Sequence, residues 1–228
     1  MTHHTEKSAL NDSEAKRLLE KFGIALPPER FISQRAEVVA AADSMGYPVV
    51  LKGIGAKLMH KTERGLVHLN LADSSAVENA VKSLSAEAGK DLDGFLLQPH
   101  ILGRREFVAG LFQDRQFGPV IMFGIGGVFT EAFSDVVFRL APLTETDARE
   151  MFEEIKGKAL LGDFRGEKAV RQEELIQTLL GLSRIGETRP EISEIDINPL
   201  LVDPEGSVAA VDALVVTEIG RASCRERV

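Results

Sequence analysis

The residues best suited to chemistry on phosphate groups stand at the ends of predicted strands. Lys52 closes the apolar run Val49–Leu51 and precedes a glycine-rich loop, so its ammonium group could contact a phosphate. Gly124, Gly126 and Gly127 follow the apolar strand Val120–Phe123, and glycines after a strand let the backbone approach a phosphate closely. A solvated lysine and a plain tight turn are the alternatives. The dinucleotide fingerprint is excluded, because Phe129 stands where it requires a third glycine.

The C-terminal hairpin brings two candidate magnesium ligands together. Asp196 and Asn198 alternate with isoleucines, and a turn centred on Glu205 precedes a predicted return strand at Val208–Val216. Symmetric pairing about this turn puts Asn198 opposite Asp212, and opposed residues share a face about 5 Å apart. Two oxygen donors at this spacing could bind Mg²⁺ together with phosphate oxygens and waters. An Asn–Asp hydrogen bond is the alternative, and Asp196 on the same face is an alternative ligand.

Two further side chains allow a chemical and a structural interpretation. His60 lies in the polar loop Met59–Glu63, and a neutral imidazole can accept a phosphoryl group near pH 7. An ordinary surface histidine fits the same pattern. Glu106 opens a strand after Arg104 and Arg105, so it could hydrogen-bond a ribose, lie beside phosphates or pair with an arginine.

Composition bounds the class of protein. The chain has 228 residues and a net charge of −8, which disfavours binding of nucleic acid through a general electrostatic footprint. A single cysteine, Cys224, excludes a disulfide framework and a thiolate metal cluster. No apolar run approaches the ~20 residues that span a bilayer, and the polar first eight residues do not form a secretory signal. We expect a cytoplasmic protein.

Helical and strand periodicities are mixed along the chain, and several strands are linked as hairpins. The predicted helices are Ser13–Phe22, Val38–Met45, Ser75–Ala88, a segment from Thr144 to about Ile155, and Glu173–Ile185. The predicted strands outside the C-terminal hairpin are Val49–Lys52, Val67–Leu71, Phe95–Gln98, Glu106–Leu111, Pro119–Phe123 and Val136–Leu140. In the predicted strand Val67–Leu71, the side chains of Val67, Leu69 and Leu71 should form one buried face. The pattern predicts an α+β fold with mainly antiparallel sheets.

The last eleven residues, Glu218–Val228, differ from the rest of the sequence. They are basic, lack periodicity and contain Cys224. We expect this segment to be translated vector sequence and exclude it from the fold.

An ordered set of segments resembles the ATP-grasp part of the NDP-forming acyl-CoA synthetases, with the succinyl-CoA synthetase β subunit as a more distant relative. The segments are Pro48–Lys52, His60–Gly65, Glu106–Gly110, Phe117–Gly127 with Glu131, Phe164–Gly166, Glu194–Leu200 and Val211–Ala213. They occur in family order from about Ser8 to Val216, and Phe117–Gly127 is the most specific. One departure is Leu66, where many members have a second glycine.

This resemblance implies a role for each matching residue. Lys52 would contact ATP phosphates, and Glu106 would hold the nucleotide. The segment Gln98, Pro99, His100 and Ile101 would line the adenine cleft, and Gly126 with Gly127 would form the phosphate-side loop. Asn198 and Asp212 would bind Mg²⁺. His60 would relay the phosphoryl group between the nucleotide and the acyl-CoA half of the enzyme.

The resemblance also implies a fold and an activity. The fold would be an ATP-grasp fold of α+β (α/β) class, with subdomains at residues 8–97 and 98–217 and the nucleotide in the cleft between them. The chain would bind ATP/ADP and Mg²⁺ as one half of an ADP-forming acyl-CoA synthetase. Its partner would be a CoA-binding α subunit or domain, in a hetero-oligomer or a fused chain, with no role for nucleic acid or membrane.

Two other functions fit the same motifs. One is a non-catalytic nucleotide-sensing ATP-grasp module fused or docked to another enzyme such as an acyltransferase. The other is an ATP-grasp ligase for an unrelated acid and amine. The element His60–Glu63 disfavours the ligase, because an acyl phosphate that is attacked directly needs no histidine relay.

Overall fold

The computed structural model describes residues 6–55, 65–127 and 135–219, and the chain divides into two compact units. The larger unit contains residues 1–26 and 102–228, and the smaller unit contains residues 27–101. Each unit has a hydrophobic core of its own. No helix in the described ranges is long and apolar enough to cross a lipid bilayer.

The larger unit is built on a seven-stranded sheet in the order β1-β11-β9-β6-β7-β8, with β10 added beside β9. Its strands are β1 (Glu6–Ala9), β6 (Arg105–Asp114), β7 (Gly118–Ile125), β8 (Val136–Leu140), β9 (Ile192–Val202), β10 (Val208–Ala210) and β11 (Ala213–Ile219). Every recorded pairing between these strands is antiparallel. The predicted α+β class with mainly antiparallel sheets is therefore confirmed.

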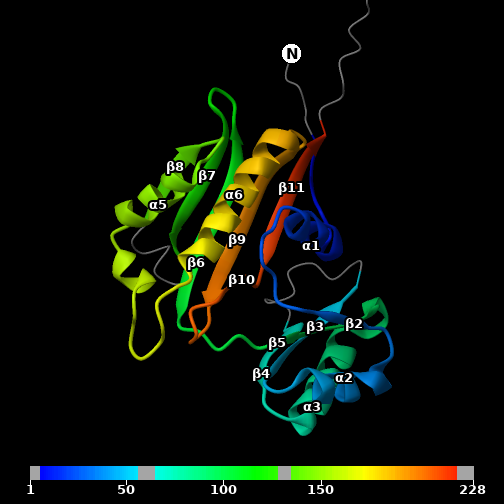
Figure 1. Cartoon of the computed structure of the whole chain (residues 1–228). Helices are drawn as coiled ribbons and strands as arrows, with labels where there is room; N and C mark the ends of the chain where they lie inside the picture. The colour runs from blue at the N-terminus through cyan, green and yellow to red at the C-terminus, as the bar shows by residue number, and fades with distance from the viewer. Residues whose placement is uncertain (1–5, 56–64, 128–134, 220–228) are drawn as a thin grey trace, which may run out of the picture. The chain divides into compact units, whose positions relative to one another are not determined.

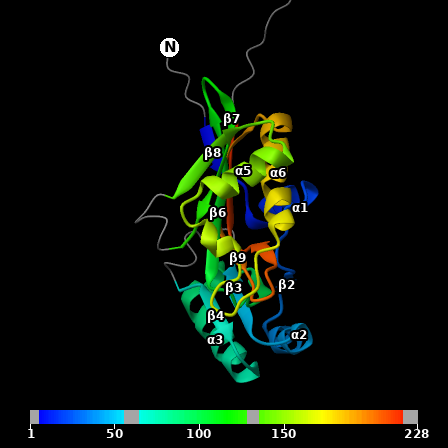
Figure 2. The same ribbon diagram turned by 60° about the vertical axis from the view of Figure 1, so that its left-hand side comes forward.

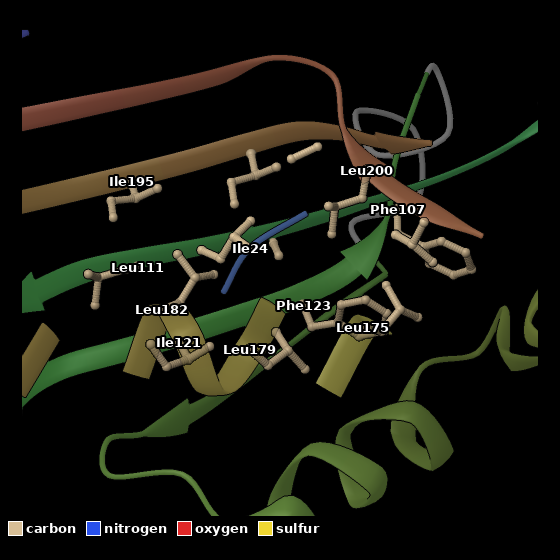
Figure 3. Packing of buried hydrophobic residues seen from close by; sticks show 14 of the residues in the cluster. Ile24, Phe107, Leu111, Ile121, Phe123, Leu175, Leu179, Leu182, Ile195 and Leu200 are labelled. Carbon is tan, nitrogen blue, oxygen red and sulfur yellow. The ribbon is translucent and has the colours of Figure 1, made fainter. Parts of the chain in front are cut away.

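Three helices cover one face of this sheet: α1 (Asp12–Lys21), α5 (Glu145–Glu154) and α6 (Gln172–Thr188) (Figures 1 and 2). The 3-10 helix η3 (Lys158–Leu161) follows α5. The buried residues of α6 include Leu175, Leu179 and Leu182, which recur every three or four positions and form one apolar stripe. In Figure 3 this stripe lies against Ile121 and Phe123 of β7. Burying each such side chain stabilises the fold by about 1.5–3 kcal/mol.

The helix start predicted at Thr144 is confirmed in detail. The Thr144 hydroxyl accepts a hydrogen bond from the Asp147 backbone N–H at 3.2 Å, and the Asp147 carboxylate accepts one from the Thr144 N–H at 2.7 Å. These reciprocal bonds satisfy backbone donors that the first turn of α5 cannot pair internally.

The smaller unit is a four-stranded antiparallel sheet in the order β2-β5-β3-β4. Its elements are β2 (Arg30–Ile32), η1 (Arg35–Glu37), α2 (Val38–Met45), β3 (Val49–Ile54), β4 (Val67–Leu71), α3 (Ser74–Ala88), η2 (Gly89–Asp91) and β5 (Gly94–Pro99). Helices α2 and α3 pack on one face of the sheet (Figure 1). Leu66, noted above as a departure from the resemblance, is fully buried in this core.

The alternation predicted for Val67–Leu71 is wrong. Asn70 has a left-handed φ of 54°, and the pairing with β3 shifts between Val49 and Leu51. This β-bulge breaks the two-residue period. Leu71 is consequently buried whereas Leu69 is 62% exposed.

The predicted return strand Val208–Val216 is interrupted. It forms β10 and β11, and the break falls at residues 211–212. β11 continues to Ile219, two residues into the segment expected to be a vector-derived tail, and residues 220–228 lie outside the described ranges.

The predicted subdomain boundaries at 8–97 and 98–217 also differ from the observed division. β1 pairs with β11 at the far end of the chain, and Leu18 and Leu19 of α1 lie in the core of the larger unit. The N-terminal residues up to Leu26 therefore belong to the larger unit. Local periodicity contains no information on such a distant partner.

A buried arginine anchors the segment between α5 and α6 to the start of β6. Arg105 is 1% exposed and donates to the carbonyls of Leu160, Gly162 and Lys168. It also pairs with the Glu167 carboxylate at 3.1 Å. One side chain thus satisfies three backbone carbonyls of this segment, which also places Ile155, Leu161 and Val170 in the core.

Replacing Arg105 with methionine is expected to lower the free energy of unfolding by about 3–5 kcal/mol, because it leaves the Glu167 carboxylate, which is only 11% exposed, without its cation. Denaturant unfolding measures the change. Arg149→Met is the matched control, since its pairs with Glu145 and Glu173 are exposed and contribute little. Equal losses in the two variants would contradict this interpretation of Arg105.

Candidate functional site

The face of the larger sheet opposite α1, α5 and α6 carries no helix from the described residues of this unit, and we call it the uncovered face. It presents a row of polar side chains on β9. Ile195 and Ile197 are buried beneath the helices, and Glu194, Asp196 and Asn198 alternate with them. Successive residues of a strand point to opposite faces, so these three side chains share the uncovered face.

The predicted register between Asn198 and Asp212 is confirmed. Val202 pairs with Val208 and Ile197 with Ala213, on either side of these two residues. The Asn198 N–H donates to the Asp212 carbonyl at 3.2 Å. Both side chains are exposed, and the Asp212 carboxylate accepts one backbone hydrogen bond, from Ala213 at 3.0 Å.

The electrostatics of this face favour a bound cation. Burial raises the pKa of Asp196 above its ordinary 3.8, and the nearby carboxylates of Glu194 and Asp212 raise it further. Negative charge is therefore crowded on this face, and a divalent cation would relieve the repulsion. Glu194 was not predicted as part of the site, although the two-residue spacing of Glu194, Asp196 and Asn198 contained the signal.

The donor set fits Mg²⁺. No group of three His, Cys, Asp or Glu side chains in the described ranges could enclose a metal. Asn198 and Asp212 would instead supply one amide and one carboxylate oxygen. Mg²⁺ in phosphoryl-transfer sites commonly has one or two protein oxygens and completes its shell with waters and phosphate oxygens.

Asp196→Asn is expected to raise the thermal midpoint of the metal-free chain at pH 7 by no more than a few degrees. The raised pKa of Asp196 means that its ionised form opposes folding. The stabilising contribution of the protonated acid is complete below its ordinary pKa of 3.8 and is lost as pH rises through the folded-state pKa. The gain from asparagine should shrink as pH is lowered, and thermal melts at pH 7 and pH 4 measure it. A gain that stays constant with pH would contradict this explanation.

A glycine turn lies beside Glu106 at the end of β7. The Gly126 N–H donates to the Glu106 carbonyl at 2.8 Å. A Cβ atom on Gly127, whose φ is +69°, would lie 2.8 Å from Glu106 Oε2. The Glu106 side chain could move to relieve this contact, but the left-handed φ favours glycine at position 127. A Cβ atom on Gly126 would lie 2.9 Å from the Phe107 carbonyl oxygen, so backbone excludes a side chain there. Within the described residues Glu106 forms no ion pair, and Arg105 binds Glu167 instead.

Glu106 and Asn198 lie near one end of neighbouring strands. Glu106 pairs with Leu201 of β9, three positions from Asn198, which corresponds to about 10 Å along the strand. Phe107, fully buried, stacks on Phe123 with ring centroids 5.6 Å apart and holds this end of β6 in the core. The larger unit thus brings together Glu106, the glycine turn and the Asn198–Asp212 pair at one end of the sheet.

Lys52 and Gln98 share a face of the smaller sheet. Val50 pairs with Gln98 and Lys52 with Leu96, so the two polar side chains are two positions apart on adjacent strands. They point away from the core that Leu51 and Leu97 enter. Gln98 is 5% exposed and donates to Glu29 Oε2 at 2.8 Å.

The segment that follows Gln98 leaves the smaller sheet. Pro99 ends β5, the His100 N–H donates to the Pro48 carbonyl at 2.9 Å, and Ile101 is the last residue of the unit. The Nδ1 atom of His100 is buried without a hydrogen-bond partner in the described residues. His60 lies outside the described residues.

Three comparisons with known proteins bear on the chain. Residues 2–217 match the model of a family described as an ATP-grasp domain. The β subunit of ADP-forming acetate–CoA ligase I from Pyrococcus furiosus is 37% identical over 216 residues, covering 92% of this chain and 93% of that protein. ADP-forming acetate–CoA ligase I from Archaeoglobus fulgidus is 36% identical, and this chain covers 30% of its length.

A solved structure gives the same result at the level of the fold. A dinucleotide-forming acetyl-coenzyme A synthetase 1 from Ca. Korarchaeum cryptofilum, in complex with coenzyme A and Mg-AMPPCP, is 37% identical and superposes with a TM-score of 0.79. The match covers 92% of each chain. The chain therefore has the ATP-grasp fold and belongs to the family of the β subunits of ADP-forming acyl-CoA ligases.

Proposed function

We propose that the chain binds ATP/ADP and Mg²⁺ as the nucleotide half of an ADP-forming acyl-CoA synthetase. The complete reaction would be acid + CoA + ATP ⇌ acyl-CoA + ADP + phosphate. The observation that supports this most strongly is the pairing of Asn198 with Asp212 on an acidic, uncovered sheet face. Glu106 and the glycine turn at Gly126–Gly127 lie at the same end of that sheet.

Asn198 and Asp212 would hold Mg²⁺, which when bound neutralises phosphate charge. Glu106 would contact the nucleotide, and the glycine turn would let backbone N–H groups approach its phosphates. Lys52 would add a positive charge from the smaller unit. Gln98, Pro99, His100 and Ile101 would contact the adenine, a role favoured by the buried, unpartnered Nδ1 atom of His100.

His60 would carry the phosphoryl group. A neutral ring nitrogen would attack the γ-phosphorus of ATP, so that the P–O bond to ADP breaks and a P–N bond to the histidine forms. The ADP oxygen leaves with the bonding pair. The phosphohistidine then returns its phosphoryl group to ADP or passes it to the partner. In the related Korarchaeum enzyme, a phosphohistidine segment points towards the nucleotide-binding site.

The remaining chemistry would need a CoA-binding α subunit or domain. The Pyrococcus relative is a β subunit, and the fused Archaeoglobus relative is about three times as long as the matched region. The chain would therefore act in a hetero-oligomer or as part of a larger protein, and alone it would perform only the histidine half-reaction.

This half-reaction provides the test. The chain is incubated with Mg²⁺ and ATP labelled in the γ-phosphate. We expect acid-labile, base-stable label on the protein, one ADP released per phosphate bound, and loss of the label as ATP when MgADP is added. Bound nucleotide without any transfer of label would contradict the relay.

A further inference from the structure

A basic segment interrupts an otherwise acidic chain. Residues 156–171, here called the basic segment, contain five basic and two acidic residues, a net charge of 5 − 2 = +3, in a chain of net charge −8. Both acids are engaged within the fold: Asp163 accepts from the Ala169 N–H at 2.8 Å, and Glu167 pairs with Arg105 at 3.1 Å. Lys158, Lys168 and Arg171 pair with glutamates outside the segment, and among the described residues Arg165 forms no ion pair.

The tip of the basic segment is a tight turn that presents Arg165. Phe164 and Glu167 exchange two backbone hydrogen bonds of 3.0 and 2.9 Å. Arg165 and Gly166 lie between them with φ angles of +48° and +87°. The left-handed region is uncommon for arginine, so the surrounding structure must enforce this conformation.

Two buried charged residues supply that constraint. Arg105 binds the carbonyls of Leu160, Gly162 and Lys168, as described above. Asp135 is 9% exposed, and its two carboxylate oxygens accept from the N–H groups of Lys156 and Gly157 at 2.8 and 2.7 Å. The segment is thus fixed at both ends by charged groups of the larger sheet and its adjoining loop, which makes it a rigid support.

The guanidinium group of Arg165 is exposed and oriented. Its Cζ atom lies 5.3 Å from the centre of the Phe164 ring, so the ring covers one face and leaves N–H edges accessible. Among the described residues Arg165 has no ion pair. Lys158, Lys168 and Arg171 have exposed pairs with glutamates, which are weak enough for a stronger anion to displace.

We propose that the basic segment is an anion-binding site for a polyphosphate group, with Arg165 as its principal ligand. A planar guanidinium binds phosphate oxygens through two hydrogen bonds, and several cations within one segment suit a group of several negative charges better than a single carboxylate. Adenine nucleotides and CoA both carry a diphosphate. This proposal depends on the proposed function only for the choice of adenine nucleotides and CoA as the two ligands to test.

Calorimetric titrations with CoA and with MgADP, each at low and at physiological salt, test this site. Arg165→Asn removes the charge and keeps the turn, because asparagine tolerates the left-handed region. Lys82→Gln on α3 is the control, since it removes one exposed charge from the smaller unit. We expect one ligand to bind roughly tenfold more weakly to Arg165→Asn, with a shallower salt dependence, and unchanged to Lys82→Gln.

The ligand that loses affinity identifies the source of the polyphosphate. If Arg165→Asn binds both ligands as the parent chain does, or if the parent chain binds neither at millimolar concentration, the site is refuted. MgADP binding that depends on Asp212 but not on Arg165, with no effect on CoA, refutes the site and leaves the proposed function intact. CoA binding that depends on Arg165 when MgADP does not bind supports the site and refutes the proposed function.

Discussion

Asp212→Ala is expected to weaken binding of MgADP by roughly 100-fold, since loss of a metal ligand should cost at least as much as loss of a supporting residue. The fold should survive, because the Asp212 side chain is exposed and accepts one hydrogen bond from a neighbouring residue. Calorimetry of MgADP binding measures the loss. Glu78→Ala, an exposed acid on α3, is the control and should bind MgADP as the parent chain does.

A double-mutant cycle strengthens this test. If Asn198 and Asp212 bind one ion, the double alanine variant should lose much less affinity than the sum of the two single losses, because the second change acts on a site already emptied. Two independent sites would give additive losses, and that result would contradict the shared ion.

His60→Ala should abolish transfer of the γ-phosphoryl group to the protein and leave MgADP affinity within a factor of about two. The imidazole is the proposed nucleophile and alanine offers no replacement for it. The labelling experiment described above measures transfer, and calorimetry measures binding. His3→Ala near the N-terminus is the matched histidine control.

The same pair of measurements separates an enzyme from a nucleotide sensor. If the chain is a nucleotide sensor, the parent chain and His60→Ala should both bind MgADP, and neither should accept the labelled phosphoryl group. Label that persists on His60→Ala would place the phosphoryl group elsewhere and contradict the histidine relay.

Local patterns predicted much of the fold. The helix Val38–Met45 and the strand Val136–Leu140 have the predicted bounds, because their periodicity and flanking residues act within a few positions. The register of Asn198 with Asp212 followed from turn symmetry alone. The two-residue period fails at Asn70, where a bulge depends on a single left-handed residue.

Long-range features could not be predicted from local patterns. The pairing of β1 with β11 joins the two ends of the chain, and the contact of Arg105 with Glu167 spans 62 residues. Sequence proximity suggests only the adjacent Glu106 as a partner for Arg105. Its burial by the segment between α5 and α6 leaves Glu106 without that partner, which favours a role for this carboxylate toward a ligand.

The most direct test of the account is calorimetric titration of the parent chain with ADP, once with excess Mg²⁺ and once with EDTA. The acidic face formed by Glu194, Asp196 and Asp212 should repel ADP unless a cation lies between them. We predict saturable binding with Mg²⁺ and little or none with EDTA. Equal affinity under both conditions, or no binding at millimolar MgADP, would contradict a magnesium-dependent nucleotide site at Asn198 and Asp212.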